Sequence, residues 1–163
     1  MIDLHTHTFA SDGDLAPAEL VRRAEAAGLA AIAITDHADA SNLERLVAET
    51  AAFVRATQPY VGIRILAGVE LTHVPPGQVA ELVRRARSAG AMLVVVHGET
   101  ISEPVAPGTN RAAIEAGIDV LAHPGLVTAE EARLAAAKGV LLEVSLRPSH
   151  GMANSRVVAA ARE

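Results

Sequence analysis

Five short apolar runs along the chain are each followed at once by a residue that can bind a metal or carry a proton. The runs at 2–4, 32–35, 65–69, 92–96 and 120–122 precede His5, Asp36 with His37, Glu70, His97 and His123. In parallel α/β folds the active site lies at the carboxyl ends of the strands. The pattern therefore predicts both a parallel sheet and a functional site at its carboxyl-terminal edge.

The segments between the apolar runs predict helices. We expect strands at about 2–5, 31–36, 63–71, 91–97, 119–123 and 140–145, and helices at about 18–27, 43–56, 78–89, 111–116 and 128–139, with a sixth helix from 154 or 155. Thr128 and Glu131 form a capping-box pattern. Four of the helices are followed by glycine, as is typical of helix C-termini. This βα alternation predicts an α/β fold with a parallel sheet, wound as a barrel or as an open layer.

The alternation stops after the last predicted helix, where the next glycine and strand were due. We therefore expect a single domain over residues 1–163 that is C-terminally incomplete and lacks at least one closing strand. A complete six-stranded layer is the alternative. An unclosed barrel would expose strand edges, which could pair with another chain to form an oligomer.

Composition narrows the chemistry. The 163 residues are half hydrophobic, which suits one domain with a sizeable core. The absence of cysteine means that any metal must be bound by histidines and carboxylates. The net charge of −5 gives no footprint for nucleic acid. No apolar run approaches the roughly 20 residues of a membrane span, and no signal segment precedes the first strand, so we expect a soluble cytoplasmic protein.

The strand-end residues are candidate metal ligands. His5 and His7 flank one residue of extended backbone, so both imidazoles can point to the same side and bind one ion. Glu70 ends a strand that should be buried on both faces, and it needs a cationic partner there, which is either a metal or an arginine such as Arg64. His97 and His123 are each followed by small or turn-forming residues that leave the ring accessible. Together these positions predict metal binding.

A further site could form beside the first one. Asp12 and His37 are its candidate ligands, although the Asp12–Gly13 pair is also common turn chemistry. We expect Asp36 to orient an imidazole rather than to bind metal. Nitrogen and oxygen donors without sulfur favour Zn, Mn or Fe. More than four ligands imply two or three divalent ions, an arrangement that activates water for phosphoester hydrolysis.

These motifs resemble the polymerase and histidinol phosphatase (PHP) superfamily over nearly the whole chain. The matching positions are His5-x-His7, Thr35-Asp36-His37, Gly68-Val69-Glu70, His97 and His123-Pro124-Gly125. The resemblance implies a distorted (β/α) TIM-like barrel of seven βα units, about six of which are present. It also implies a trinuclear metal centre. His5, His7 and Glu70 would bind the first ion, Glu70, His97 and His123 the second, and Asp12 and His37 the third.

The segment from Leu142 to Asn154 looks like the histidinol-phosphatase-like branch of that superfamily. Arg147 and His150 would there face the substrate phosphate, and His73, past another strand end, could contact substrate or only pack in its loop. The superfamily's final Asp-x-His motif is absent. Its loss would leave the first ion with three protein ligands and the third with two at most, which should weaken metal binding.

Three functions remain open at this point. The first is hydrolysis of a phosphomonoester of a small molecule, such as histidinol phosphate, by metal-activated water. The second is a phosphodiesterase or exonuclease acting on nucleotide ends, which the acidic net charge speaks against. The third is a metal-binding module whose catalysis has lapsed. We expect a small phosphorylated substrate and neither a membrane nor a nucleic-acid partner.

Overall fold

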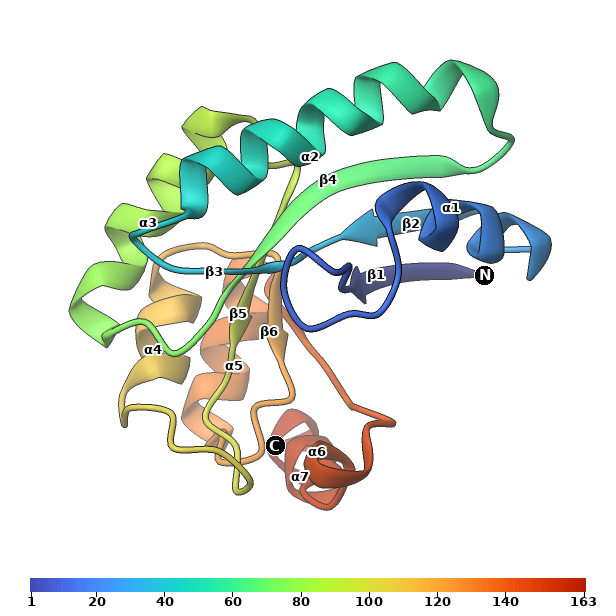
Figure 1. Ribbon diagram of the computed structural model, residues 1–163. Helices are drawn as coiled ribbons and strands as arrows, with labels where there is room; N and C mark the ends of the chain where they lie inside the picture. Colours follow the sequence, from blue (N-terminus) through green and yellow to red (C-terminus); the bar gives the residue numbers. More distant parts are fainter. The chain divides into compact units, whose positions relative to one another are not determined.

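A computed structural model describes all residues, 1–163, and shows strands that alternate with helices along the chain (Figure 1). The chain divides into two compact units. The first comprises Met1–Glu70 with Arg84–Val94, and the second Leu71–Val83 with Val95–Glu163. None of the helices is both long and apolar enough to span a bilayer.

Three parallel strands form the sheet of the first unit. They are β1 (Ile2–Thr6), β2 (Ala31–Ile34) and β4 (Arg64–Leu71), with β2 between the other two. A two-residue strand, β3 (His37–Ala38), also pairs with β4. The helices of this unit are α1 (Pro17–Ala26) and α2 (Leu43–Thr57), which runs into the short 3₁₀ helix η1 (Gln58–Tyr60).

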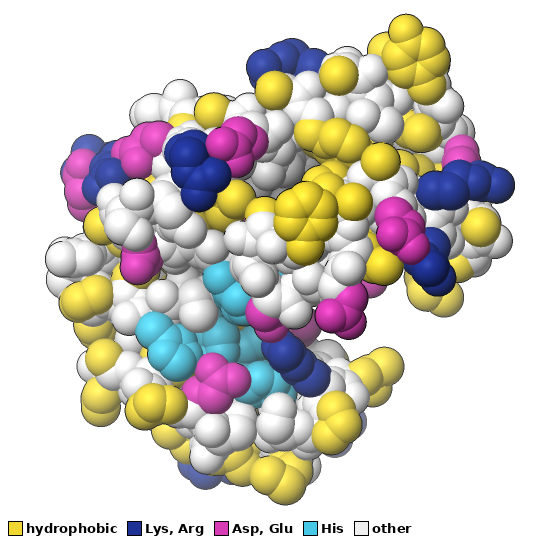
Figure 2. Space-filling model, viewed as in Figure 1, with side chains coloured by type: hydrophobic (Ala, Val, Ile, Leu, Met, Phe, Trp, Pro, Cys, Tyr) yellow, Lys and Arg dark blue, Asp and Glu magenta, His cyan; other side chains and the backbone are white.

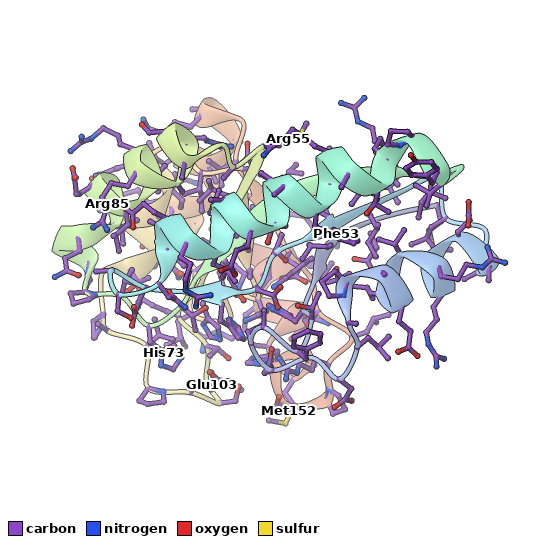
Figure 3. All side chains as sticks on the ribbon, turned by 45° about the horizontal axis from the view of Figure 1, so that its top comes forward. Phe53, Arg55, His73, Arg85, Glu103 and Met152 are labelled. Atoms are coloured by element: carbon purple, nitrogen blue, oxygen red, sulfur yellow. The ribbon has the colours of Figure 1, made fainter.

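Branched aliphatic side chains make the core of the first unit. Val21 of α1 packs with Ile32 and Ile34 of β2 and with Ile65 of β4, and each of these side chains is almost fully buried. Phe53 of α2, which is partly buried, packs against this cluster (Figure 3). β-Branched residues suit strands whose faces are buried, so the same side chains favour the strands and fill the core.

The second unit also has three parallel strands, the last two of which are very short. β5 (Leu93–His97), β6 (Val120–Ala122) and β7 (Leu141–Leu142) run parallel in that order. The helix α5 (Ala129–Lys138) packs against both α4 (Thr109–Glu115) and α7 (Asn154–Arg162), while α6 (Pro148–Gly151) is a single turn. Both β5 and α3 (Pro76–Ala89) contribute residues to both units. Val127, Ala132, Val157 and Ala160 form a small core here.

The predicted fold class, a parallel α/β fold of the distorted (β/α)-barrel type, is confirmed. The capping box of Thr128 and Glu131 is present, and the glycines that follow the four helices have positive φ. The two-residue β3 and the single-turn α6 were not predicted, and β7 is shorter than the predicted 140–145. The last strand ends early because the side chain of Asn154 binds the backbone N–H and C=O of Ser145. That the chain is a single domain lacking at least one further closing strand stays a prediction.

Candidate metal centres

The first cluster of candidate ligands lies at the carboxyl ends of the strands of the first unit. The register of β1 on β2 shifts just before Thr6, whose backbone oxygen accepts a hydrogen bond from the Thr35 hydroxyl (3.1 Å). This contact ties the end of β1 to the end of β2. Across the irregular stretch, the Nε2 atoms of His5 and His7 approach to 3.1 Å. The two imidazoles therefore present adjacent nitrogen donors, as the His-x-His pattern predicts.

Glu70 is the centre of this cluster. Its side chain is fully buried, and its Oε2 lies 2.8 Å from His37 Nδ1, 3.3 Å from His5 Nε2 and 3.5 Å from His7 Nε2. Burial raises the pKa of Glu70, but the close contacts with His37 and His5 outweigh burial and hold that pKa well below its usual range. The carboxylate is therefore ionised. Three imidazoles therefore lie within 3.5 Å of its Oε2 and can partner this buried charge.

A second group of donors shares two of these imidazoles. Asp12 Oδ1 lies 3.3 Å from His37 Nε2 and 3.7 Å from His7 Nδ1. Burial lowers the pKa of His7. Burial also lowers the pKa of His37. The close contact with Glu70 and the charge of that carboxylate have the opposite and larger effect, so the pKa of His37 is raised overall. His7 is thus the more readily neutral ring, and a neutral ring can donate a lone pair to a metal.

The turn that carries Asp12 is set by Gly13. The Gly13 N–H donates to the Thr8 carbonyl (2.9 Å), and a Cβ at Gly13 would lie only 2.3 Å from the His7 carbonyl oxygen. Only glycine fits this close approach of two backbone segments. The Asp-Gly pair is therefore turn chemistry, and the same turn places the Asp12 carboxylate beside His7 and His37.

Asp36 stabilises the loop after His7. Its Oδ1 accepts hydrogen bonds from the Thr8 N–H (2.7 Å) and the Ser11 hydroxyl (2.6 Å), and its Oδ2 accepts from the Thr8 hydroxyl (2.7 Å). The side chain is nearly fully buried. These hydrogen bonds fix the backbone of Thr8, the residue after His7. That Asp36 orients an imidazole rather than binding metal stays a prediction.

The second cluster lies at the carboxyl ends of β5 and β6, in the second unit. His97 is the last residue of β5, and His123 follows β6 with a φ of 33°. Positive φ is uncommon for residues other than glycine and often marks functional positions. Nδ1 of His97 lies 3.1 Å from the Gly98 carbonyl oxygen, and Nδ1 of His123 lies 3.3 Å from Glu143 Oε2. Such partners hold a ligating imidazole in one tautomer.

Glu103 joins three histidines of this cluster. Its Oε2 lies 3.0 Å from His73 Nε2 and 3.2 Å from His97 Nε2, and its Oε1 lies 3.3 Å from His150 Nε2. Figure 3 shows His73 and Glu103 side by side, and Figure 2 shows histidine and acidic side chains gathered on one face. Burial raises the pKa of Glu103. The charge of His97 and the hydrogen bond to His73 outweigh burial, so the pKa of Glu103 is lowered overall.

His150 and Arg147 differ in their surroundings. Arg147 is exposed at the start of α6, where it can meet a ligand from solvent. His150 is 2% exposed, its ring stacks on that of His123 with centroids 4.1 Å apart, and its Nδ1 lies 3.1 Å from the Ser102 hydroxyl. Burial and the neighbouring His123 lower the pKa of His150. The structure therefore places His150 among the candidate metal ligands, and the substrate role of Arg147 stays a prediction.

Sequence reasoning missed Glu103 and Glu143. Glu143 follows the sixth apolar run directly, so the strand-end pattern that selected the other five positions could have selected it as well. Glu103 lies six residues past His97 in an irregular loop, and no periodicity points to it. A loop residue of this kind is found only once the fold of the loop is known.

The donor sets fit divalent metal ions. Within the first unit, His5, His7 and Glu70 form one group of donor atoms within 4.8 Å of one another, and His7, Asp12 and His37 form another. Within the second unit the groups are His97, His123 and His150, and His73, His97 and Glu103. Imidazole and carboxylate donors without sulfur suit Zn, Mn or Fe better than Ca or Mg. A buried carboxylate surrounded by imidazoles is also the arrangement that a cation would stabilise.

The chain is similar in sequence to known proteins. The chain is 45% identical to the uncharacterized protein MJ1295 of Methanocaldococcus jannaschii, over 99% of this chain and 75% of that protein. It is 43% identical to a 5'-3' exoribonuclease of Haemophilus influenzae over 70 residues, which are 43% of this chain and 23% of the enzyme.

Two solved structures share the fold. Crystal structures of a Xaa-Pro dipeptidase and of an amidohydrolase each match with a TM-score of 0.52, at 13% and 12% identity. The matches cover 86% and 88% of this chain but only 52% and 54% of those proteins, so the chain spans about half their length.

The comparison also fixes the family. The PHP domain matches residues 3–114, a segment that begins before His5 and ends after His97. This match spans more than half of the chain, and it contains all five candidate ligands of the first unit. The chain belongs to the PHP domain family.

Proposed function

We propose that the chain hydrolyses a phosphomonoester of a small molecule, of the histidinol phosphate type. The PHP domain implies a metal-dependent hydrolase. The observation that carries the proposal is the buried Glu70 carboxylate with three imidazoles within 3.5 Å, at the carboxyl ends of parallel strands. When bound, divalent ions in such a donor set lower the pKa of water and stabilise the charge that develops on phosphate oxygens.

The residues of the chain have separate tasks in this proposal. We assign His5, His7, Asp12, His37 and Glu70 to metal binding in the first unit, and His97 and His123 to metal binding in the second. Arg147, exposed and close in sequence to the second cluster, suits bidentate contact with a phosphate. Its guanidinium would hold the substrate from the solvent side, and no covalent enzyme intermediate is needed.

Specificity for a small ester follows from charge. The sequence carries 19 acidic and 14 basic residues. Proteins that bind polynucleotides contact the phosphate backbone through clustered Lys and Arg, so the excess of acidic residues speaks against such a substrate. A small monoester needs only one cationic contact besides the metals. His73 lies at the solvent edge of its cluster and is a second candidate contact, because its side chain is 38% exposed.

A second candidate function is cleavage of RNA ends. The partial similarity to the 5'-3' exoribonuclease favours it, since the same metal chemistry serves phosphodiesters. A metal-binding module without catalysis is the third reading. It differs from the other two by holding ions and releasing no product.

One set of assays separates these functions. The purified chain is loaded with Mn²⁺ or Zn²⁺, its bound metal is measured, and it is tested on p-nitrophenyl phosphate, histidinol phosphate and a short RNA. Phosphate release from the small esters alone supports the proposal. Shortening of the RNA supports the second function, and bound metal without turnover supports the third.

The Glu70→Gln variant provides the matched test. We expect it to lose phosphate release by at least about 100-fold, because the loss of a ligand exceeds the 10–100-fold effect of an outer partner. Glu49→Gln is the control, since Glu49 is exposed on α2 and pairs only with its neighbour Arg45 on the same helix. A Glu70→Gln variant as active as Glu49→Gln would overturn the proposal.

A further inference from the structure

We propose that a groove at the amino-terminal end of β4 binds a mononucleotide through Arg55 and Arg64. None of the residues that line this groove belongs to a cluster of candidate metal ligands. The inference goes beyond the proposed function, because it assigns a second ligand site to the first unit, whatever substrate the chain cleaves.

The groove lies far from the candidate centre around Glu70. Its volume is about 410 Å³, and pockets for small molecules measure about 300–1,000 Å³. Arg64 is the first residue of β4, whereas Glu70 lies near its carboxyl end. At about 3.3 Å per residue, these two positions are about 20 Å apart along the strand. The lining residues all belong to the first unit and are Val54, Arg55, Gln58, Arg64, Ile65 and Met92.

Hydrogen bonds fix the lining of the groove. The side-chain Nε2 of Gln58 donates to the Ile63 carbonyl oxygen, and its Oε1 accepts from the Ile65 N–H, both at 2.8 Å. The Met92 N–H donates to the Ala67 carbonyl oxygen (2.7 Å), which holds the residue before β5 against β4. Because these bonds hold the backbone of the groove in place, a ligand pays little to order it on binding.

Two arginines give the groove its charge. The side chains of Arg55 and Arg64 are exposed, and neither forms an ion pair or a side-chain hydrogen bond within the chain (Figure 3). Arg45 on the same helix as Arg55, in contrast, pairs with Glu49 at 2.9 Å. None of the lining residues is acidic. The groove therefore offers two guanidinium groups to an anion, and guanidinium binds phosphate oxygens bidentately.

The apolar part of the lining indicates what the phosphate carries. Val54 is partly buried and Ile65 is buried, while Met92 is 51% exposed. An exposed methionine favours an aromatic neighbour, because its thioether is polarisable and its chain adapts in shape. Arginine also stacks on flat rings. A phosphate with an aromatic base uses both kinds of lining, whereas inorganic phosphate would leave Met92 in water. A mononucleotide is thus the class of ligand that fits.

The test titrates AMP, adenosine and inorganic phosphate into the full chain by calorimetry. A chelator is present, so that no divalent ion offers the phosphate another site. We expect one AMP per chain, bound more tightly than adenosine or inorganic phosphate. Arg55→Gln and Arg64→Gln should each weaken AMP binding by at least about 10-fold, because a hydrogen bond to a charged group contributes that much. Arg45→Gln, which removes the same charge from α2 outside the groove, is the matched control and should leave AMP binding intact.

A variant of Met92 tests the nucleotide class. Met92→Gln should weaken AMP binding and leave the binding of inorganic phosphate unchanged. No saturable binding of AMP, or equal binding of AMP and inorganic phosphate, would overturn the inference.

The outcomes also separate this inference from the proposed function. If Arg147→Ala abolishes AMP binding while Arg55→Gln and Arg64→Gln retain it, the nucleotide lies at the candidate centre and the inference is overturned. The substituted side chains of the groove are exposed, so the variants should fold, and far-UV circular dichroism checks this. Phosphatase assays do not enter this decision.

Discussion

Asn154 binds both backbone polar groups of Ser145. The Ser145 N–H donates to Asn154 Oδ1 (3.0 Å), and Asn154 Nδ2 donates to the Ser145 carbonyl oxygen (2.8 Å). Asn154 begins α7, while Ser145 lies three residues past the end of β7. One side chain thereby replaces the strand pairing that would otherwise satisfy these groups, and it turns the chain toward Arg147 and His150.

Replacing this side chain should destabilise the second unit. Asn154→Ala leaves a buried donor and a buried acceptor without their partner, so we expect the free energy of unfolding to fall by about 2 kcal/mol. Urea unfolding of the metal-free chain measures it. Ser155→Ala, at an exposed position of the same helix, should change stability by less than about 0.5 kcal/mol. An equal effect of the two substitutions would contradict this role of Asn154.

A methyl group at Gly13 should disturb both stability and metal binding. A Cβ there would lie 2.3 Å from the His7 carbonyl oxygen and 2.8 Å from the Thr8 nitrogen, and neither backbone atom can yield cheaply. We expect Gly13→Ala to cost about 1–3 kcal/mol in urea unfolding. Because the turn also moves Asp12, Mn²⁺ affinity should fall.

Gly77 offers the control for this substitution. A Cβ at Gly77 would meet no atom within 4 Å, and the residue lies in the first turn of α3. Gly77→Ala should therefore leave Mn²⁺ affinity unchanged and preserve or raise stability. If Gly13→Ala unfolds at the same urea concentration as the unmodified chain, the close approach of the two backbone segments does not constrain this turn.

The sequence predicted the fold and much of the candidate site because both depend on where strands end. In the first unit Glu70 lies near the end of β4, and in the second unit His97 is the last residue of β5, as the strand-end pattern predicts. The capping box and the terminal glycine, which are local signals, also predicted α5.

The remainder depends on contacts that local signals do not encode. Glu103 meets His73, which lies 30 residues earlier in the sequence. β7 ends early through a side chain nine residues further along the chain. The contact between Asp36 and Thr8 spans 28 residues. Such pairings follow from tertiary structure, so neither propensity nor spacing predicts them.

Stability should depend on pH through Glu25. Its Oε1 accepts a hydrogen bond from the Gly62 N–H (2.7 Å), and its Oε2 accepts one from Arg22 (2.7 Å). The backbone hydrogen bond of Gly62 and the one from Arg22 lower the pKa of Glu25 below its ordinary 4.5. A carboxylate with a lowered folded-state pKa stabilises the fold above the unfolded pKa, and this contribution is lost as the pH falls through the folded pKa.

The Glu25→Gln variant measures that contribution. The difference in unfolding free energy between the unmodified chain and Glu25→Gln should be full above about pH 5 and should shrink as the pH falls below 4.5. Glu19→Gln, which breaks the ion pair of Glu19 with Arg23 on the same helix, is the comparison. We expect a smaller change in stability there, because exposed i,i+4 pairs contribute little. A pH-independent difference for Glu25→Gln would contradict the role of its charge.

Removal of metal should lower the thermal stability of the chain through Glu70. The fully buried carboxylate lies 3.3 Å from His5 Nε2 and 2.8 Å from His37 Nδ1, and a bound ion would replace these contacts with stronger ones. An ion at 100 times its Kd stabilises the fold by about 2.7 kcal/mol. For a chain of this size that raises Tm by about 5–10 °C. We therefore expect Mn²⁺ or Zn²⁺ to raise Tm by that amount and a chelator to reverse the rise.

Mg²⁺ should have a much smaller effect, and Glu70→Gln should lose most of the Mn²⁺ shift. A Tm that ignores Mn²⁺, Zn²⁺ and chelator alike would mean that the imidazoles around Glu70 pair with it alone and hold no ion.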